Sequence, residues 1–316
     1  MAVVTALLLT TLAVTIVASL FWQQQVQVRS MENQRLQFQT RWIVRGSLNF
    51  SKLILFTDFY SQGGVTSANG IWSKPLEETR IDDYIEREQR EEENFNATLA
   101  GQIVDAQSRY NLTNLAPGGK IDALEVAVLQ RLLTNLQLDQ TLAMKVASQV
   151  ASAQPVVQTP DTTGTGKPTG AAQSAASIEP MGLVRVEDLL ALSGFTPQAV
   201  ERLREFLIIL PQVAPLDVNT APAELLAALS PNLPLADAAV LVNKRKQGYF
   251  YRDKADYTKE QQLLAANRQP AGRYDVRSSY FLVYSRVRLD RAALDAVSLL
   301  QRGSNGMSTV VWIREN

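Results

Sequence analysis

The sequence predicts an α+β fold in which a long N-terminal helix packs on an antiparallel sheet, with a large all-α segment inserted between the strands. Three observations support this prediction. The first 28 residues contain no charged side chain. Segments with alternating or β-branched character lie near 101–112 and at the C-terminus. The region between them, about 120–272, shows helical periodicity instead.

The N-terminal segment Ala2–Phe21 is long and apolar enough to cross a membrane. About 20 such residues span a hydrocarbon core of about 30 Å as a helix. A secretory signal peptide is the alternative, with a basic n-region, an apolar run of about 7–15 residues and a small-residue cleavage site. This chain shows no basic n-region and a longer apolar run. We therefore expect an anchor that is retained.

The helix is expected to continue beyond the membrane, because neither proline nor glycine occurs before Gly46. Six side chains at spacings of three or four mark one face of this continuation: Val28, Met31, Arg35, Phe38, Trp42 and Ile43. We expect this amphipathic half to carry the sheet, with Phe38 and Trp42 as the helix-packing anchors. The rod should end near 56–60.

Composition restricts the possible functions. The 316 residues contain 31 Lys and Arg against 31 Asp and Glu, so net charge gives no indication of nucleic acid as a principal partner. Cysteine and histidine are both absent. Disulfides, thiolate metal sites and Ser-His or Cys-His catalysis are therefore excluded. No motif indicates another catalytic group, so we expect no enzyme activity, no catalytic residues and no cofactor.

Behind the rod, 61–70 is typical of a glycine-rich loop, and 76–93 carries nine acids against three arginines. We interpret the acidic run as a solvated helix face, with recognition of a basic partner as the alternative. A strand follows near 101–112, and a turn at 114–120.

From residue 121 to 153 the apolar spacing predicts helix, and 154–180 is typical of a flexible loop rich in Pro, Gly, Thr and Ser. An internal repeat comes next, in which 186–193 recurs loosely as 222–229, each copy running into an alanine-rich helix. This repeat resembles the helix-hairpin-helix family.

That resemblance supplies an alternative function, a membrane-anchored periplasmic DNA-binding protein. Hairpin amides and nearby basic side chains would contact phosphates. The basic cluster of the chain comprises Lys244, Arg245, Lys246, Arg252 and Lys254. Against this alternative, neither hairpin has the Gly-hydrophobic-Gly turn that lets backbone amides approach a phosphate. Ser193-Gly194-Phe195 has one of the two glycines. The second hairpin has neither, and its Pro231 lacks a backbone donor. A structural helical insert is the competing interpretation.

Strands are expected again at 278–290, 293–303 and 307–315. If they pair with the strand near 101–112, the chain divides into three parts. These are a transmembrane helix (1–24), an α+β core (25–119 plus 273–316), and an inserted α-helical domain (120–272) that contains the loop 154–180.

The N-terminus resembles that of type IV pilin-like proteins, whose leader ends in glycine and is removed by prepilin peptidase. Five segments narrow the resemblance to the K-type minor pseudopilins of bacterial type II secretion: LFWQQQVQVRSMENQR, IVDAQSRYNLTNL, VEDLLALSGFT, LDVNTAPAELLAAL and RSSYFLVYSRV. The core would then be pilin-like. The arginines after the span would by themselves place the bulk of the chain in the cytoplasm. The resemblance instead implies a single-pass protein of the bacterial inner membrane with a periplasmic globular part.

The resemblance further implies a subunit that caps the pseudopilus and supports export of folded proteins across the outer membrane. Its partners would be the I- and J-type minor pseudopilins in a tip complex, the major pseudopilin, and secreted substrates. Methylation of the Met1 amine is expected by the same resemblance. The resemblance also implies that calcium could bind, because members of this family often carry acidic calcium ligands in the inserted domain. The corresponding stretch here is the 154–180 loop, whose only acids are Asp161 and Glu179. Calcium requires six to eight oxygen ligands, so no metal ligands are named.

Position 5 carries the assembly prediction. Most pilin-like proteins have a glutamate there, which pairs with the N-terminal amine of a neighbouring subunit. Thr5 has no charge to neutralise in lipid, whereas the Met1 amine could still receive the glutamate of a subunit below. Met1 and Thr5 are thus the expected assembly residues of a subunit that starts a filament. The alternative is an ordinary transmembrane threonine.

Overall fold

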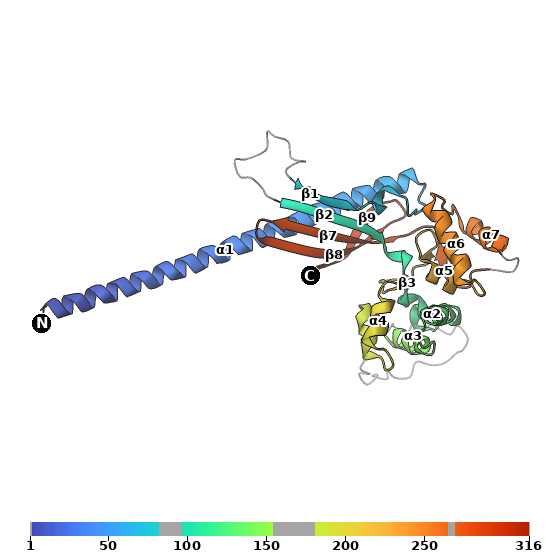
Figure 1. Cartoon of the computed structure of the whole chain (residues 1–316), viewed down its shortest axis with the longest axis horizontal. Helices are drawn as coiled ribbons and strands as arrows, with labels where there is room; N and C mark the ends of the chain where they lie inside the picture. Colours follow the sequence, from blue (N-terminus) through green and yellow to red (C-terminus); the bar gives the residue numbers. More distant parts are fainter. Residues whose placement is uncertain (1, 82–96, 154–180, 265–268, 316) are drawn as a thin grey trace, which may run out of the picture.

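The computed structural model describes residues 2–81, 97–153, 181–264 and 269–315. It consists of a long helical rod, a sheet that lies along the C-terminal half of the rod, and a helical domain at the end far from the N-terminus (Figure 1). The loop 154–180, with Asp161 and Glu179, lies outside the described residues, as does Met1.

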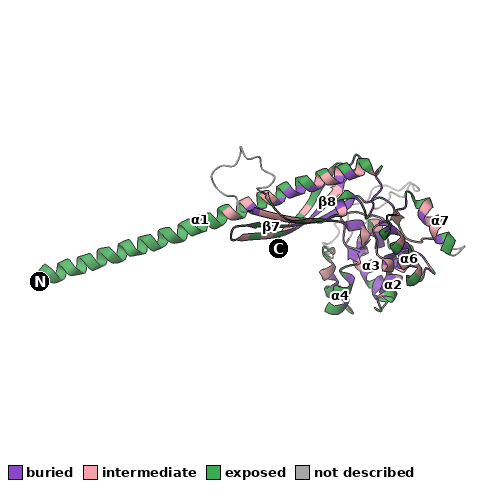
Figure 2. Cartoon of the chain, turned by 45° about the horizontal axis from the view of Figure 1, so that its top comes forward, coloured by how far each residue is buried: buried purple, intermediate pink, exposed green. Residues whose placement is uncertain are grey.

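The rod is one unbroken helix, α1 (Ala2–Ser61), of 60 residues. At about 1.5 Å per residue it is about 90 Å long. Its only glycine, Gly46, lies in open space, since a Cβ added there would meet no atom within 4 Å. The N-terminal half projects away from the rest of the molecule and is exposed throughout, as Figure 2 shows. The expected end of the rod, near 56–60, agrees with this helix.

The sheet contacts a face of α1 that differs from the predicted one. Its buried residues are Thr40, Val44, Ser47, Leu48, Ser51, Leu55 and Asp58. Val44, Leu48 and Leu55 pack in one apolar cluster with Trp72 and Phe281. Phe38 and Trp42, the expected anchors, are 60% and 66% exposed, so they do not attach the sheet to the rod. The apolar stripe exists, but it faces away from the sheet.

The hydroxyl side chains on the buried face explain why sequence periodicity missed it. Thr40 Oγ1 donates to the Gln37 carbonyl and Ser47 Oγ to the Val44 carbonyl, at 2.9 and 2.8 Å. These short polar residues satisfy their own hydroxyls on the helix and can be buried against strands at little cost. Ser47 Oγ also lies 3.0 Å from Ser285 Oγ on the sheet.

The main sheet is antiparallel, with strand order β1-β2-β7-β8-β9. Its strands are β1 (Leu76–Arg80), β2 (Ala97–Asp105), β7 (Tyr280–Leu289), β8 (Ala292–Arg302) and β9 (Ser308–Glu315). The three C-terminal strands lie where the sequence predicts them. The strand expected near 101–112 begins earlier and ends at Asp105, where a short 3-10 turn follows (Ala106–Ser108).

One prediction in this region is wrong. The start of the acidic run, expected as a solvated helix face, is the edge strand β1, which pairs with β2. The pairing with β2 decides its conformation, and local charge does not. The remainder of the run, from 82 onward, lies outside the described residues.

The chain leaves the sheet after Asp105 and returns at Tyr280, so the helical domain is inserted between two adjacent strands. Its helices are α2 (Ala123–Asn135), α3 (Leu142–Ser152), α4 (Pro197–Leu203), α5 (Ala223–Leu229), α6 (Leu235–Lys246) and α7 (Lys254–Leu264). Two parallel pairs of two-residue strands accompany them: β3 (Tyr110–Asn111) with β4 (Leu207–Ile208), and β5 (Leu216–Asp217) with β6 (Tyr274–Asp275). The domain is therefore helical but not all-α.

Two helical expectations need correction. The helix expected over 121–153 is interrupted after Asn135, where Gln137 adopts a left-handed backbone with φ of 57°. The second repeat forms two α-helices, α5 and α6, as the sequence predicts. The first repeat begins as a 3-10 helix (Val186–Ala191) and reaches α-helix only in α4.

Candidate functional site

The N-terminal half of α1 is the first functional feature. Among the described residues, α1 is the one helix whose length and composition would allow it to cross a membrane. The apolar segment that meets this criterion is not buried against any other part of the chain. This finding supports a single-pass membrane anchor. Thr5 lies within it, and its hydroxyl donates to the Ala2 carbonyl at 2.9 Å. The threonine therefore needs no partner from another helix.

Beyond the span, α1 presents an outward stripe opposite the sheet. We define it by Val28, Met31, Phe38, Trp42 and Leu53, which are between 51% and 66% exposed. Helical spacing places them on the side away from Ser47 and Leu55. A row of large exposed apolar side chains on a soluble surface typically marks an interaction site. Phe38 and Trp42 therefore belong to this outward stripe and do not pack against the sheet.

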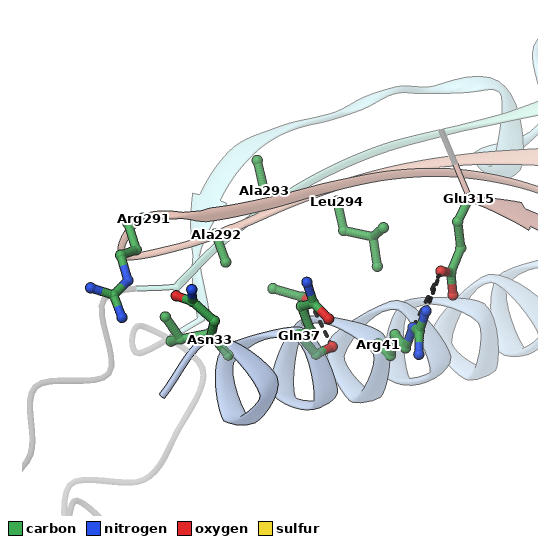
Figure 3. Close-up of a pocket in the computed structure, with 10 residues that line it drawn as sticks. Asn33, Gln37, Arg41, Arg291, Ala292, Ala293, Leu294 and Glu315 are labelled. Carbon is green, nitrogen blue, oxygen red and sulfur yellow. Dashed lines mark hydrogen bonds and ion pairs between the residues drawn. The ribbon is translucent and has the colours of Figure 1, made fainter. Parts of the chain in front are cut away.

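A polar groove of about 470 Å³ lies where the rod leaves the sheet (Figure 3). Asn33 and Gln37 line its rod side, and the start of β8 lines the other. Two ion pairs connect its walls. Arg41 reaches Glu315 of β9 at 2.9 Å, and Arg291 reaches Glu32 at 3.0 Å. Exposed pairs of this kind contribute about 0–1 kcal/mol each, so they orient the rod more than they stabilise it.

The second functional feature is the seam between sheet and helical domain, which we define by Asp105, Asp217, Thr220, Ser278 and Arg302. Asp105 ends β2 and Asp217 lies in β5, and both are fully buried. Ser278 Oγ lies 2.7 Å from Asp105 Oδ2 and 2.8 Å from Asp217 Oδ2. Burial raises the pKa of Asp105 to about 6 and raises the pKa of Asp217 well above its usual range.

Arg302, at the end of β8, completes the seam. Its Nη2 donates to the Ser278 carbonyl at 2.8 Å and to Thr66 Oγ1 at 3.1 Å. The guanidinium lies over the Phe281 ring, 4.6 Å from its centroid. Burial lowers the pKa of Arg302, while nearby carboxylates oppose that shift. Sequence reasoning identified none of these residues, since their partners are up to 236 positions away in the chain.

The basic cluster that motivated the DNA-binding alternative is largely used inside the chain. Arg245 is buried and donates to the carbonyls of Val218 and Ala221. Lys244 Nζ pairs with Glu260 at 2.7 Å, and Lys254 Nζ pairs with an aspartate of β6 at 3.3 Å. These contacts hold the helical domain together and favour the structural-insert interpretation.

The second hairpin is also engaged internally. Ser230, which follows α5, is buried and exchanges hydrogen bonds with Gln261 of α7 at 2.7 and 2.9 Å. A hairpin that contacts phosphate must expose its turn. Here the first residue of the turn is buried in the domain, and although Asn232 is exposed, Pro231 removes one backbone donor. Among the described residues, no group of three or more carboxylates lies close enough together to hold a metal ion.

Comparison with known proteins agrees with this architecture. Residues 108–212 and 216–277 match two models of the family "Type II secretion system (T2SS), protein K", which together cover just over half of the chain. The chain is 26% identical to "Type II secretion system protein K" of Pseudomonas aeruginosa, over 98% of this chain and 90% of that protein.

The fold is similar to a chain in the crystal structure of the GspK-GspI-GspJ complex from the type 2 secretion system of enterotoxigenic Escherichia coli. The TM-score is 0.64 at 16% identity, covering 91% of this chain and 99% of that chain. The α+β fold and the family resemblance predicted from the sequence are both confirmed. The chain therefore belongs to the type II secretion system protein K family, the K-type minor pseudopilins.

Proposed function

We propose that this chain starts and caps the pseudopilus of a type II secretion system and so supports export of folded proteins across the outer membrane. It acts as a structural subunit and not as an enzyme. Residues 2–21 hold it in the bacterial inner membrane, and the sheet and helical domain lie in the periplasm. The observation that carries this proposal is the position of the helical domain at the end of the rod far from the membrane span (Figure 1).

The shape favours the tip over an internal position. Helices α2 to α7, which the structure describes in the insert, widen the molecule beyond the sheet, at the end where a further subunit would have to stack. An uncharged Thr5 agrees with this arrangement. A subunit with nothing above it has no neighbouring amine to pair with a carboxylate, and an unpaired carboxylate in lipid costs several kcal/mol.

The outward stripe supplies the contact surface for the partners. We propose that it packs against the helices of the I- and J-type minor pseudopilins in a tip complex, with the major pseudopilin below and secreted substrates meeting the distal domain. The similar fold comes from a complex that contains such subunits, which supports this assignment. Large aromatic side chains such as Phe38 and Trp42 are typical of the centre of protein interfaces.

The test is substitution of Thr5 in the complete secretion system. Thr5→Glu should leave the fold intact, because Thr5 contacts only its own helix, but should reduce pseudopilus initiation and secretion. Thr5→Ala is the matched control and should behave as wild type, since it adds no charge. Pseudopilus number and length by electron microscopy, with secreted protein in the medium, measure both. Normal assembly by Thr5→Glu, or an equal defect in Thr5→Ala, would refute the position-5 argument.

A further inference from the structure

The seam contains two carboxyl groups bridged by one hydroxyl. Asp105 lies at the end of sheet strand β2, and Asp217 lies in β5 of the helical domain. Ser278, whose hydroxyl bridges them, lies in the connection that leads into β7. All three side chains are at most 3% exposed. The three side chains are therefore shielded from bulk solvent, and the 2.7 and 2.8 Å contacts through Ser278 link the two carboxyl groups directly.

Counting hydrogens shows that this arrangement needs one extra proton. Ser278 Oγ lies within hydrogen-bond distance of both carboxyl groups, at 2.7 and 2.8 Å. A serine hydroxyl has one hydrogen to donate and two lone pairs to accept. With both carboxylates ionised, one of the two short contacts would place two lone pairs against each other. Both contacts are hydrogen bonds only if one carboxyl group is protonated and donates to Ser278.

The remaining donors show which group carries the proton. Asp105 accepts three: the Gln107 N–H at 2.8 Å, the Thr220 hydroxyl at 2.5 Å and the Ser278 hydroxyl. Apart from the Ser278 bridge, Asp217 accepts the Asn219 N–H at 2.8 Å. Because hydrogen bonds to a carboxylate favour its ionised form, Asp105 is the anion and Asp217 Oδ2 holds the proton.

The charged groups around the seam come from every side. Arg302 of β8 favours ionisation of Asp105, and Arg245 of α6 favours ionisation of Asp217. Asp275 of β6 is paired in register with Asp217, and its own charge is met by Lys254. Burial and the neighbouring Asp105 outweigh the arginine and hold the pKa of Asp217 well above its usual range.

We propose that a single proton, held on Asp217 Oδ2, lets Asp217 donate to Ser278 while Ser278 donates to Asp105, that this hydrogen-bond chain bonds the helical domain to the sheet, and that loss of the proton at higher pH loosens the seam. Apolar contacts of Ile208 and Leu210 with Tyr280 and Leu282 keep the two parts together when the proton leaves. The distal domain thereby becomes more mobile relative to the rod without separating from it.

The asymmetry of the two acids gives a sharp test. Asp217→Asn reproduces the protonated acid, because its amide N–H can donate to Ser278 while its carbonyl accepts from Asn219. Asp105→Asn instead places an amide N–H against two hydroxyl donors. We expect Asp217→Asn to fold normally and Asp105→Asn to be destabilised. Asp295→Asn, on an exposed carboxylate of β8, is the matched control and should match wild type.

Infrared spectroscopy of the full-length protein in detergent, with aspartate labelled by carbon-13, detects the proton directly. We expect the carbonyl band of a protonated aspartic acid at neutral pH, absent in Asp217→Asn and retained in Asp58→Asn, which alters a buried aspartate with a raised pKa outside the seam. Absence of the band from wild type would overturn the proposal. Loss of the band in Asp58→Asn alone would also overturn it, because the proton would then lie outside the seam.

Thermal unfolding against pH provides a second readout that does not depend on labelling. A group whose pKa is raised by folding stabilises the protein fully below its unfolded pKa, and that stability is lost as pH rises through the folded value. For one proton, the unfolding equilibrium constant should rise up to tenfold per pH unit in this range. Asp217→Asn should flatten this dependence and Asp295→Asn should leave it unchanged. Equal slopes in wild type and Asp217→Asn would overturn the proposal.

Discussion

Two faces of α1 should respond to mutation in opposite ways, because one supports the fold and the other is free. Leu55 is fully buried and packs with Trp72 and Phe281. Leucine has three more side-chain carbons than alanine, and at about 0.8 kcal/mol each their burial contributes about 2.4 kcal/mol. The cavity left behind adds to this loss, so Leu55→Ala should cost about 3–4 kcal/mol, within the usual range for buried leucines.

Trp42→Ala removes a larger side chain but should cost far less. Trp42 is 66% exposed, and its structural contact is the Arg45 guanidinium, 5.1 Å from the ring centroid. An exposed cation–π contact contributes about 0.5–1 kcal/mol. We therefore expect a loss of less than about 1 kcal/mol in the free energy of unfolding. If the outward stripe is the assembly surface, the same variant should recover less I- and J-type subunit on co-purification.

The assay is urea unfolding of the full-length protein in detergent, followed by tryptophan fluorescence, in which buried Trp72 of the Leu55 cluster reports on loss of the packing. Both variants keep this reporter. A midpoint for Trp42→Ala as low as that for Leu55→Ala would refute the assignment of the two faces. So would a Leu55→Ala variant with wild-type stability, because the sheet would then not depend on this side of the rod.

Three further substitutions test the packing around two glycines and the ionisation of one buried carboxyl group. Gly70→Ala should destabilise the protein by about 1–3 kcal/mol, because a Cβ there would lie 2.6 Å from a buried carboxylate oxygen and an indole nitrogen. At Gly46, in the middle of α1, an added Cβ would lie more than 4 Å from any other atom, so Gly46→Ala should stabilise the protein by about 0.5–1 kcal/mol. Urea unfolding compares the two variants. Equal effects would contradict the close packing at Gly70. Burial raises the pKa of Glu125, so its contribution to stability is present below its usual pKa and declines as pH rises through the raised value. Glu125→Gln should therefore gain stability relative to wild type as pH increases, and a difference independent of pH would contradict this assignment.

Much of the architecture follows from local pattern. The unbroken rod is predictable because no proline or glycine interrupts it before Gly46, and helix breakers act through the local backbone. The hairpin strands β7, β8 and β9 carry their own alternation and turn signals. Edge strand β1 was missed because its conformation depends on pairing with β2, which local charge does not encode.

The sequence by itself determined the membrane-length helix, its continuation as a rod, the C-terminal strands and the family. Only the tertiary structure decided which face of the rod meets the sheet. Periodicity shows that Phe38 and Trp42 share a stripe with apolar neighbours, but it does not say whether that stripe covers the chain's own sheet or another subunit. Ser47 and Ser51 look like polar surface in the sequence, yet each bonds a carbonyl of its own helix and is buried. The seam carboxyl groups were equally invisible, because a carboxylate looks solvent-exposed in a sequence until folding places a second one across a shared hydroxyl.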